Sequence, residues 1–155
     1  MKKIVHTTLQ SLDTYAQELL SHVREEQLHH PEQATILLIQ GDLGAGKTTL
    51  TQAMGGILDI ADHIVSPTYV ISRRYHTQNT AYPWKNLIHT DAYRLEHADD
   101  LKKLAYDVDC TNPDNVMIFE WPERVGNYFD KYETTRIQIE MGEEQEERVV
   151  TLIGE

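Results

Sequence analysis

Residues 41–49 read Gly41-Asp42-Leu43-Gly44-Ala45-Gly46-Lys47-Thr48-Thr49, the spacing G-x-x-x-x-G-K-[ST] of a phosphate-binding loop. Glycine tolerates positive φ, so such a loop can turn its backbone N–H groups inward and bind an anion at the start of the next helix. The lysine then reaches the β- and γ-phosphates, and the hydroxyl after it can bind Mg²⁺. The stretch therefore predicts a site for a nucleoside triphosphate.

The segments on either side of the loop support this interpretation. Residues 35–40 form a short apolar run directly before it, as expected of a parallel strand buried on both faces. After it, apolar residues recur at helical spacing, at Leu50, Ala53, Met54, Ile57 and Leu58. Strand, loop and helix come in the order that the motif requires, which disfavours the alternative of a glycine-rich turn without function.

Length and composition predict one domain over residues 1–155, with enough chain to bury a core. The net charge of −11 argues against a free-standing nucleic-acid binder, because phosphate contacts need a basic face. The single cysteine, Cys110, excludes an intramolecular disulfide and is a poor candidate for a nucleophile. We see neither a signal-peptide core nor an apolar run long enough for a bilayer, so we expect a cytoplasmic protein.

Hydrophobic periodicity predicts the remaining elements. We expect an edge strand at 2–6, an amphipathic helix at about 9–28 capped by Thr7 or Thr8, and an antiparallel hairpin of 69–76 with 86–90. Two further strands at 135–141 and 149–153 flank the acid-rich run 143–147. The predicted fold is α/β, with a mostly parallel sheet flanked by helices and extended by antiparallel hairpins.

Two carboxylates follow apolar strands. Asp91 ends the strand at 87–90, and Glu120 ends the run Val116-Met117-Ile118-Phe119. Ligands of an open parallel sheet bind outside the carboxyl ends of its strands, so Thr48, Glu120 and Asp91 can supply oxygen ligands for Mg²⁺. The alternatives are a helix N-cap for Asp91, ahead of a short helix from Leu95, and an exposed strand-end charge for Glu120.

Two other features stay open on residue chemistry alone. Ser66-Pro67-Thr68 is either a plain turn or a segment whose hydroxyls sense a phosphate or a metal-bound water. Trp121 either stacks beside the site or packs in the core.

Four motifs stand in one order: residues 41–49, Ser66-Pro-Thr-Tyr69, His89-Thr-Asp-Ala-Tyr-Arg94 and Phe119-Glu-Trp-Pro-Glu123. Together they resemble the TsaE (YjeE) family, small bacterial ATPases needed to make threonylcarbamoyladenosine at tRNA position 37. The resemblance spans roughly residues 2–153 and implies a P-loop NTPase fold. It also implies ATP and Mg²⁺ as cofactors, binding to the TsaB–TsaD pair, weak partner-stimulated ATP hydrolysis, and contact with tRNA only through partners.

The resemblance assigns roles to residues. Gly41 to Thr49 hold the phosphates, Thr48 and Glu120 hold Mg²⁺, and Asp91 is an acidic residue needed for activity. Lys47, Asp91 and Glu120 are the catalytic set. Ser66 and Thr68 belong to a switch-like segment, and Trp121 lies near the nucleotide. An adenine contact is expected near Thr8 or Leu9, and a contact from the last hairpin, at Arg148 or Gln145, is absent or made differently.

Two rival functions remain. A small-molecule P-loop kinase needs an acceptor pocket and a lid of arginines, but the adjacent pair Arg73-Arg74 falls in a predicted strand. A nucleotide-gated binding module with vestigial hydrolysis is the other. The sequence shows no evident arginine finger in cis unless Arg94 serves, so we expect the partner complex to complete the site.

Overall fold

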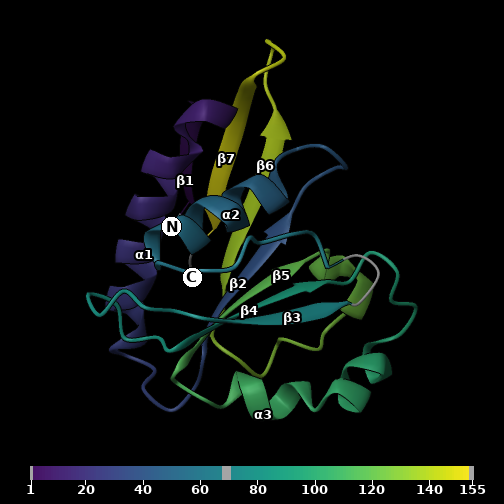
Figure 1. The fold of residues 1–155 in the computed structure, drawn as a ribbon. Helices are drawn as coiled ribbons and strands as arrows, with labels where there is room; N and C mark the ends of the chain where they lie inside the picture. The colour runs from purple at the N-terminus through teal and green to yellow at the C-terminus, as the bar shows by residue number, and fades with distance from the viewer. Residues whose placement is uncertain (1, 68–70, 154–155) are drawn as a thin grey trace.

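The structure is a computed structural model that describes residues 2–67 and 71–153. Its centre is a seven-stranded sheet with the order β1-β7-β6-β2-β5-β4-β3. The four central strands β6, β2, β5 and β4 pair in parallel, and the outer strands pair antiparallel (Figure 1). The strands are β1 (Lys2–Thr8), β2 (Thr35–Gln40), β3 (Ser72–His76), β4 (Asn86–Asp91), β5 (Asn115–Glu120), β6 (Thr135–Met141) and β7 (Glu147–Ile153).

The central strands β2 and β5 are buried on both faces, as the unbroken apolar runs predicted. Alternate residues of a strand point to opposite faces of the sheet. Leu37 of β2 and Ile118 of β5 belong to one core cluster, while Leu38 and Phe119 belong to the other. Because the sheet is covered on both sides, its central strands need an unbroken run of hydrophobic residues.

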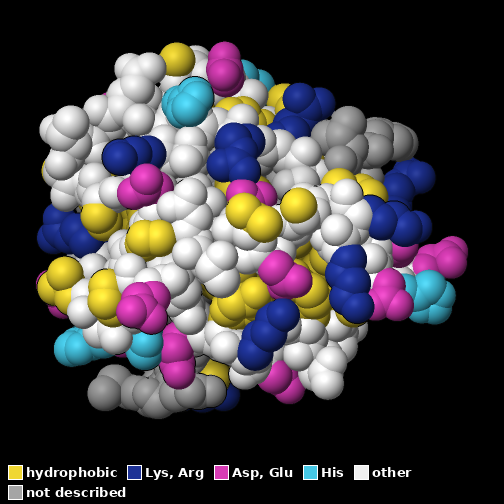
Figure 2. Space-filling view, turned by 90° about the horizontal axis from the view of Figure 1, so that it is seen from below, with side chains coloured by type: hydrophobic (Ala, Val, Ile, Leu, Met, Phe, Trp, Pro, Cys, Tyr) yellow, Lys and Arg dark blue, Asp and Glu magenta, His cyan; other side chains and the backbone are white. Residues whose placement is uncertain are grey.

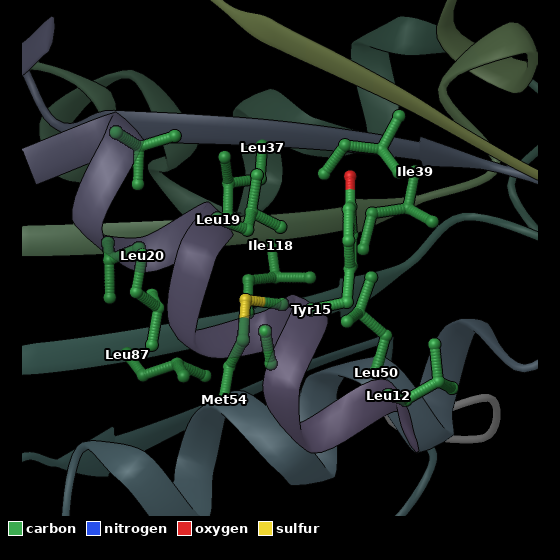
Figure 3. Packing of buried hydrophobic residues seen from close by; sticks show 14 of the residues in the cluster. Leu12, Tyr15, Leu19, Leu20, Leu37, Ile39, Leu50, Met54, Leu87 and Ile118 are labelled. Carbon is green, nitrogen blue, oxygen red and sulfur yellow. The ribbon is translucent and has the colours of Figure 1, made fainter. Parts of the chain in front are cut away.

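Two helices cover the first face of the sheet (Figure 1). They are α1 (Leu12–Gln27), preceded by a 3-10 turn η1 (Leu9–Ser11), and α2 (Lys47–Ile57), which starts within the glycine-rich loop. The apolar stripe of α1 packs on β2 and β5 and against Leu50 and Met54 of α2 (Figure 3). Each fully buried aliphatic side chain of this stripe contributes roughly 1.5–3 kcal/mol.

The second face is covered by shorter helices and aromatic rings. These helices are η2 (Ala98–Leu104), α3 (Tyr106–Cys110) and η3 (Pro122–Val125). Phe119 of β5 lies 4.8 Å from Phe129, centroid to centroid, in an edge-to-face contact. Tyr128, Lys131 and Tyr132 all donate hydrogen bonds to Asp107, so the chain after η3 is fixed onto α3.

Charges are mixed on the underside of the molecule. Figure 2 shows Lys and Arg side chains there interspersed with Asp and Glu rather than gathered into one basic patch. No helix within residues 2–67 and 71–153 combines the length and the apolar character needed to cross a membrane.

The structure confirms the predicted elements and shifts some boundaries. The helix predicted at 9–28 begins with a 3-10 turn, because the Thr8 side chain accepts a hydrogen bond from the Ser11 N–H and starts the helix. The predicted strand 69–76 is described from Ser72, since residues 68–70 lie outside the described range. The short helix expected from Leu95 begins at Ala98 and is a 3-10 helix.

Cys110 offers a test of the second core cluster. Its side chain is fully buried, and burial raises the pKa of the thiol to about 12. The thiolate, which is the reactive form, is therefore scarce near pH 8. We expect the folded protein to resist a thiol reagent such as DTNB at pH 8 and to react at one thiol per chain once unfolded in urea. Rapid labelling of the folded protein would contradict this packing.

Candidate functional site

The glycine-rich loop joins the carboxyl end of β2 to α2. Gly44 and Gly46 have φ values of +80° and +112°, which side chains with a Cβ rarely adopt. Lys47 folds back over the loop, and its Nζ donates to the carbonyls of Gly41 at 2.5 Å and Asp42 at 3.0 Å. Leu43 at the tip is 68% exposed, whereas Ala45 is buried. The loop therefore has the turn and the lysine position of a phosphate-binding loop.

Lys47 is the positive centre of the site. Burial lowers the pKa of its ammonium group, while the carboxylates of Glu120, Asp91, Glu123 and Asp42 act in the opposite direction. Its Nζ also lies 4.4 Å from the ring centroid of Trp121. The lysine is thus enclosed by negative charge and by the face of an indole ring, both of which favour its cationic form.

Glu120 and Asp91 lie side by side at the edge of the sheet next to the loop. They are paired in the parallel register of β4 and β5, and Glu120 is the neighbour of Ile39 in β2. Both carboxylates are nearly buried, with 2% of Glu120 and 6% of Asp91 exposed. The alternative of an exposed strand-end charge for Glu120 is therefore wrong.

The hydroxyl of Thr48 connects the loop to this edge. Thr48 Oγ1 donates to Glu120 Oε1 at 3.3 Å. Asp91 Oδ1 accepts from the backbone N–H of Tyr93 at 2.9 Å in a local turn. The N-cap of η2 is His97, so the helix-cap alternative for Asp91 is also wrong. The structure brings together all three oxygen-bearing side chains that the sequence proposed as Mg²⁺ ligands.

Trp121 shares in both roles that the sequence left open. It is half-buried against the second core cluster, yet its ring faces Lys47 and lies 5.1 Å from the Tyr93 ring. Its φ of +62° is unusual for a bulky residue, and such strain is concentrated at functional sites. The guanidinium carbon of Arg124 lies 5.3 Å from the centroid of the same Tyr93 ring.

The remaining predicted contacts involve Thr8, Leu9 and the segment 66–68. Thr8 caps η1, and Leu9 follows directly after it, close enough that a Cβ on Gly46 would come within 3.2 Å of Leu9 Cδ2. Ser66 is exposed, and Thr68 lies outside the described residues. The adenine contact near Thr8 or Leu9 therefore stays a prediction, although both residues lie beside the loop.

The sequence named Arg148 as a candidate in the last hairpin but did not predict what its side chain contacts. Although Arg148 is only 3% exposed, the hydrogen bonds of its guanidinium go to backbone carbonyls. Its Nε donates to the Ala45 carbonyl at 2.7 Å, and its Nη2 lies 3.4 Å from the Gly44 carbonyl. Its Nη1 holds the carbonyls of Gln145 and Glu147. The guanidinium thus ties the last hairpin to the backbone of the loop.

His89 is the residue that sequence reasoning missed. It is fully buried, and its Nε2 lies 2.5 Å from Glu120 Oε2. The period of a strand was a usable signal, because His89 precedes Asp91 by two positions and therefore shares its face. Among the described residues no group of three His, Cys, Asp or Glu side chains could hold a metal ion.

Replacing Arg148 tests its hold on the loop. In R148M, buried carbonyls lose a charged donor, so we expect the free energy of unfolding to fall by about 1–3 kcal/mol and nucleotide affinity to fall with it. R148K should not restore either, because an ammonium cannot reproduce the planar fork. Urea denaturation and nucleotide titration measure both, with R73M on the exposed edge strand β3 as the matched control. A urea midpoint for R148M equal to that of R73M would contradict the role.

Comparison with known proteins places this geometry in a family. A profile described as "Threonylcarbamoyl adenosine biosynthesis protein TsaE" matches residues 6–150. A tRNA threonylcarbamoyladenosine biosynthesis protein TsaE from Streptomyces coelicolor is 36% identical over 122 residues, which cover 77% of this chain and 79% of the relative. The protein of that name from Haemophilus influenzae is 35% identical over 95 residues, 61% of this chain and 56% of the relative.

A solved structure shares the fold. The crystal structure of Bacillus subtilis YdiB matches 98% of this chain and 84% of its own, with a TM-score of 0.65 and 23% sequence identity. The family profile spans the glycine-rich loop, both strand-end carboxylates and the arginine of the last hairpin. The chain therefore belongs to the TsaE family of threonylcarbamoyladenosine biosynthesis proteins.

Proposed function

We propose that this chain is a Mg²⁺-dependent ATPase with the P-loop NTPase fold, acting on the TsaB–TsaD complex in the threonylcarbamoyladenosine modification of tRNA. One observation carries the ATPase part. The buried Glu120 carboxylate lies at the carboxyl end of a central parallel strand and accepts the hydroxyl of Thr48, the residue after the loop lysine. This is the relation between a strand-end acid and a loop hydroxyl that serves Mg²⁺ in P-loop NTPases.

The residues fit Mg²⁺ and a triphosphate. The loop supplies backbone N–H groups at the N-terminus of α2, which favours an anion, and Lys47 adds a full positive charge. Thr48, Glu120 and Asp91 offer hard oxygen ligands, directly or through water. When bound, Mg²⁺ supplies positive charge that offsets the charge developing on the phosphates. Carboxylates alone around Lys47 would repel a triphosphate, so the acid-rich edge is consistent with a site that takes a divalent cation.

The chain's own groups divide the remaining tasks. Lys47 binds phosphate oxygens, and the loop holds the phosphates in line. Asp91 completes the carboxylate pair at the strand edge, where a water that attacks the terminal phosphorus would lie. The oxygen of that water forms a new bond to the phosphorus while the bond to the bridging oxygen breaks; one of its protons stays on the inorganic phosphate and the other passes to solvent, so ADP and inorganic phosphate leave. Burial of Glu120 and Asp91 excludes bulk water and strengthens these interactions.

The partner part of the proposal is supported by charge and by the sequence, which shows no evident arginine finger in cis unless Arg94 serves. The net charge of −11 and the mixed surface seen in Figure 2 do not suit direct binding of tRNA. The net negative charge instead suits a protein that binds a basic partner surface. Arg94, the candidate finger in cis, is exposed. We infer that the TsaB–TsaD pair completes the site and accelerates a slow intrinsic reaction.

Lys47→Ala tests the phosphate-binding role. The substitution removes a charged contact that is worth about 3 kcal/mol, so ATP affinity should fall by about two orders of magnitude. Titration of a fluorescent ATP analogue measures this, with K103A as the matched control because Lys103 on η2 is 81% exposed. Equal ATP affinity of K47A and wild type would show that the loop is not part of the nucleotide site.

Glu120→Gln tests the metal-binding role. An amide keeps the shape of the side chain but loses its charge, so we expect ATP to bind without Mg²⁺ as in wild type. Mg²⁺-dependent hydrolysis should fall by at least roughly a hundredfold, the scale of removing one electrostatic group from an active site. Phosphate release against Mg²⁺ concentration is the measurement. Unchanged turnover would show that Glu120 does not serve the metal.

Hydrolysis with and without partners decides among the functions. We expect the purified chain to hydrolyse ATP slowly and a cognate TsaB–TsaD pair to stimulate it strongly. Fast turnover by the chain alone would overturn partner gating. ADP formed only when a small-molecule acceptor is added would indicate a kinase. ATP-dependent binding of the pair without any stimulated hydrolysis would indicate a binding module.

A further inference from the structure

A buried histidine lies directly against the proposed metal ligand. His89 on β4 is 0% exposed, and Glu120 on β5 is 2% exposed. His89 Nε2 and Glu120 Oε2 are 2.5 Å apart. The proposed hydrolysis assigns no task to this histidine, which contacts Glu120 Oε2 rather than Oε1, the oxygen that Thr48 contacts.

The two oxygens of Glu120 have different partners. Thr48 Oγ1 donates to Oε1 at 3.3 Å, and His89 binds Oε2. A carboxylate with one partner can still rotate about its last torsion, which is broad for glutamate. A second, buried partner on the other oxygen removes that freedom. Glu120 Oε1 is therefore held toward the loop.

The ring of His89 has one arrangement that fits these contacts. Its Nδ1 is buried and has no hydrogen-bond partner among the described residues. Nδ1 therefore lacks a partner in either tautomer, and the contact of Nε2 decides between them, because a bare Nε2 would aim its lone pair at a carboxylate oxygen. The proton therefore belongs on Nε2, which donates it to Glu120 Oε2.

We propose that His89 is a positioning residue that holds Glu120 in the orientation needed to serve Mg²⁺ beside Thr48. The inference rests on the proposed metal role of Glu120. Partners behind a metal ligand fix its orientation, and their loss typically weakens metal binding by 10–100-fold. The histidine is thus expected to affect the metal and to leave the binding of nucleotide without metal unchanged.

Three substitutions separate positioning from packing. In H89Q the amide nitrogen lies as many bonds from Cα as Nε2 does, so it can still donate to Glu120. In H89N the amide is one bond shorter and falls where Nδ1 was, so it cannot reach. H89L fills the space without a donor. Because H89Q and H89N are equally polar, their difference reports the hydrogen bond rather than the burial of a polar group.

The measurement is the affinity for a fluorescent ATP analogue in EDTA and across a Mg²⁺ titration. In EDTA we expect all variants to match wild type within about twofold. The Mg²⁺ concentration that gives half of the Mg²⁺-dependent change in affinity should be similar for H89Q and wild type. For H89N and H89L it should be higher by roughly tenfold or more. Equal Mg²⁺ dependence of H89N, H89Q and wild type, or an equal loss in H89Q and H89N, would overturn the proposal.

E120Q, measured in parallel, keeps the two proposals apart. Wild-type Mg²⁺ dependence in E120Q would refute the metal role of Glu120, and with it the basis of the inference. Loss of that dependence in E120Q, with none in H89N, would refute only the role of His89.

A measurement on the unsubstituted protein covers the case in which these variants do not fold. Nitrogen-15 NMR of the imidazole should show the proton on Nε2 and a strongly deshielded Nε2–H signal. A neutral ring protonated on Nδ1 would overturn the proposal.

Discussion

The parallel pairing of β2, β5 and β4 is the constraint on which the rest of the structure depends. Its register places Ile39 beside Glu120 and Glu120 beside Asp91, so three strands end at one edge, where the loop begins. A slip of one residue would turn Glu120 away from α2 and toward the aromatic cluster. Burial of β2 and β5 on both faces excludes such a slip, because every side chain of either strand would exchange one core cluster for the other. The packing that stabilises the sheet is therefore also what aligns the site.

At that edge of the sheet, the carboxylates near Lys47 outnumber its one positive charge. Four carboxylates act on one ammonium group, that of Lys47, and two of them are nearly buried. Such an arrangement is costly unless each charge is paired or hydrogen-bonded. Glu120 meets this requirement through Thr48 and His89, and Lys47 through the loop carbonyls and the face of Trp121. The aromatic contact matters because an indole ring favours a cation without competing for its N–H donors.

Much of this arrangement could be predicted from the sequence, and the remainder depends on contacts between distant segments. Unbroken apolar runs predicted β2 and β5, and alternation predicted β6 and β7, because the period of a strand is local information. The loop motif located Lys47 and Thr48 for the same reason. The orientation of Arg148 toward the loop has no local signal, and the period of the strand indicates only which face His89 shares with Asp91, not its contact with Glu120. The first joins residues 103 positions apart in sequence and the second joins residues 31 apart. The start of η2 was misplaced by three residues because a 3-10 helix has weak sequence preferences.

The place of β1 and β7 in the sheet has a consequence for how the chain matures during synthesis. Lys2 pairs with Ile153, and Thr7 pairs with Arg148, so β1 can join the sheet only after β7 has been synthesised. Closing such a long loop costs entropy that is repaid only when both strands are present. The guanidinium that braces the glycine-rich loop is carried by β7. A nascent chain that has already exposed residues 41–49 but not yet β7 therefore lacks the brace of its loop, and we expect the proposed nucleotide site to form only after β7 has joined the sheet.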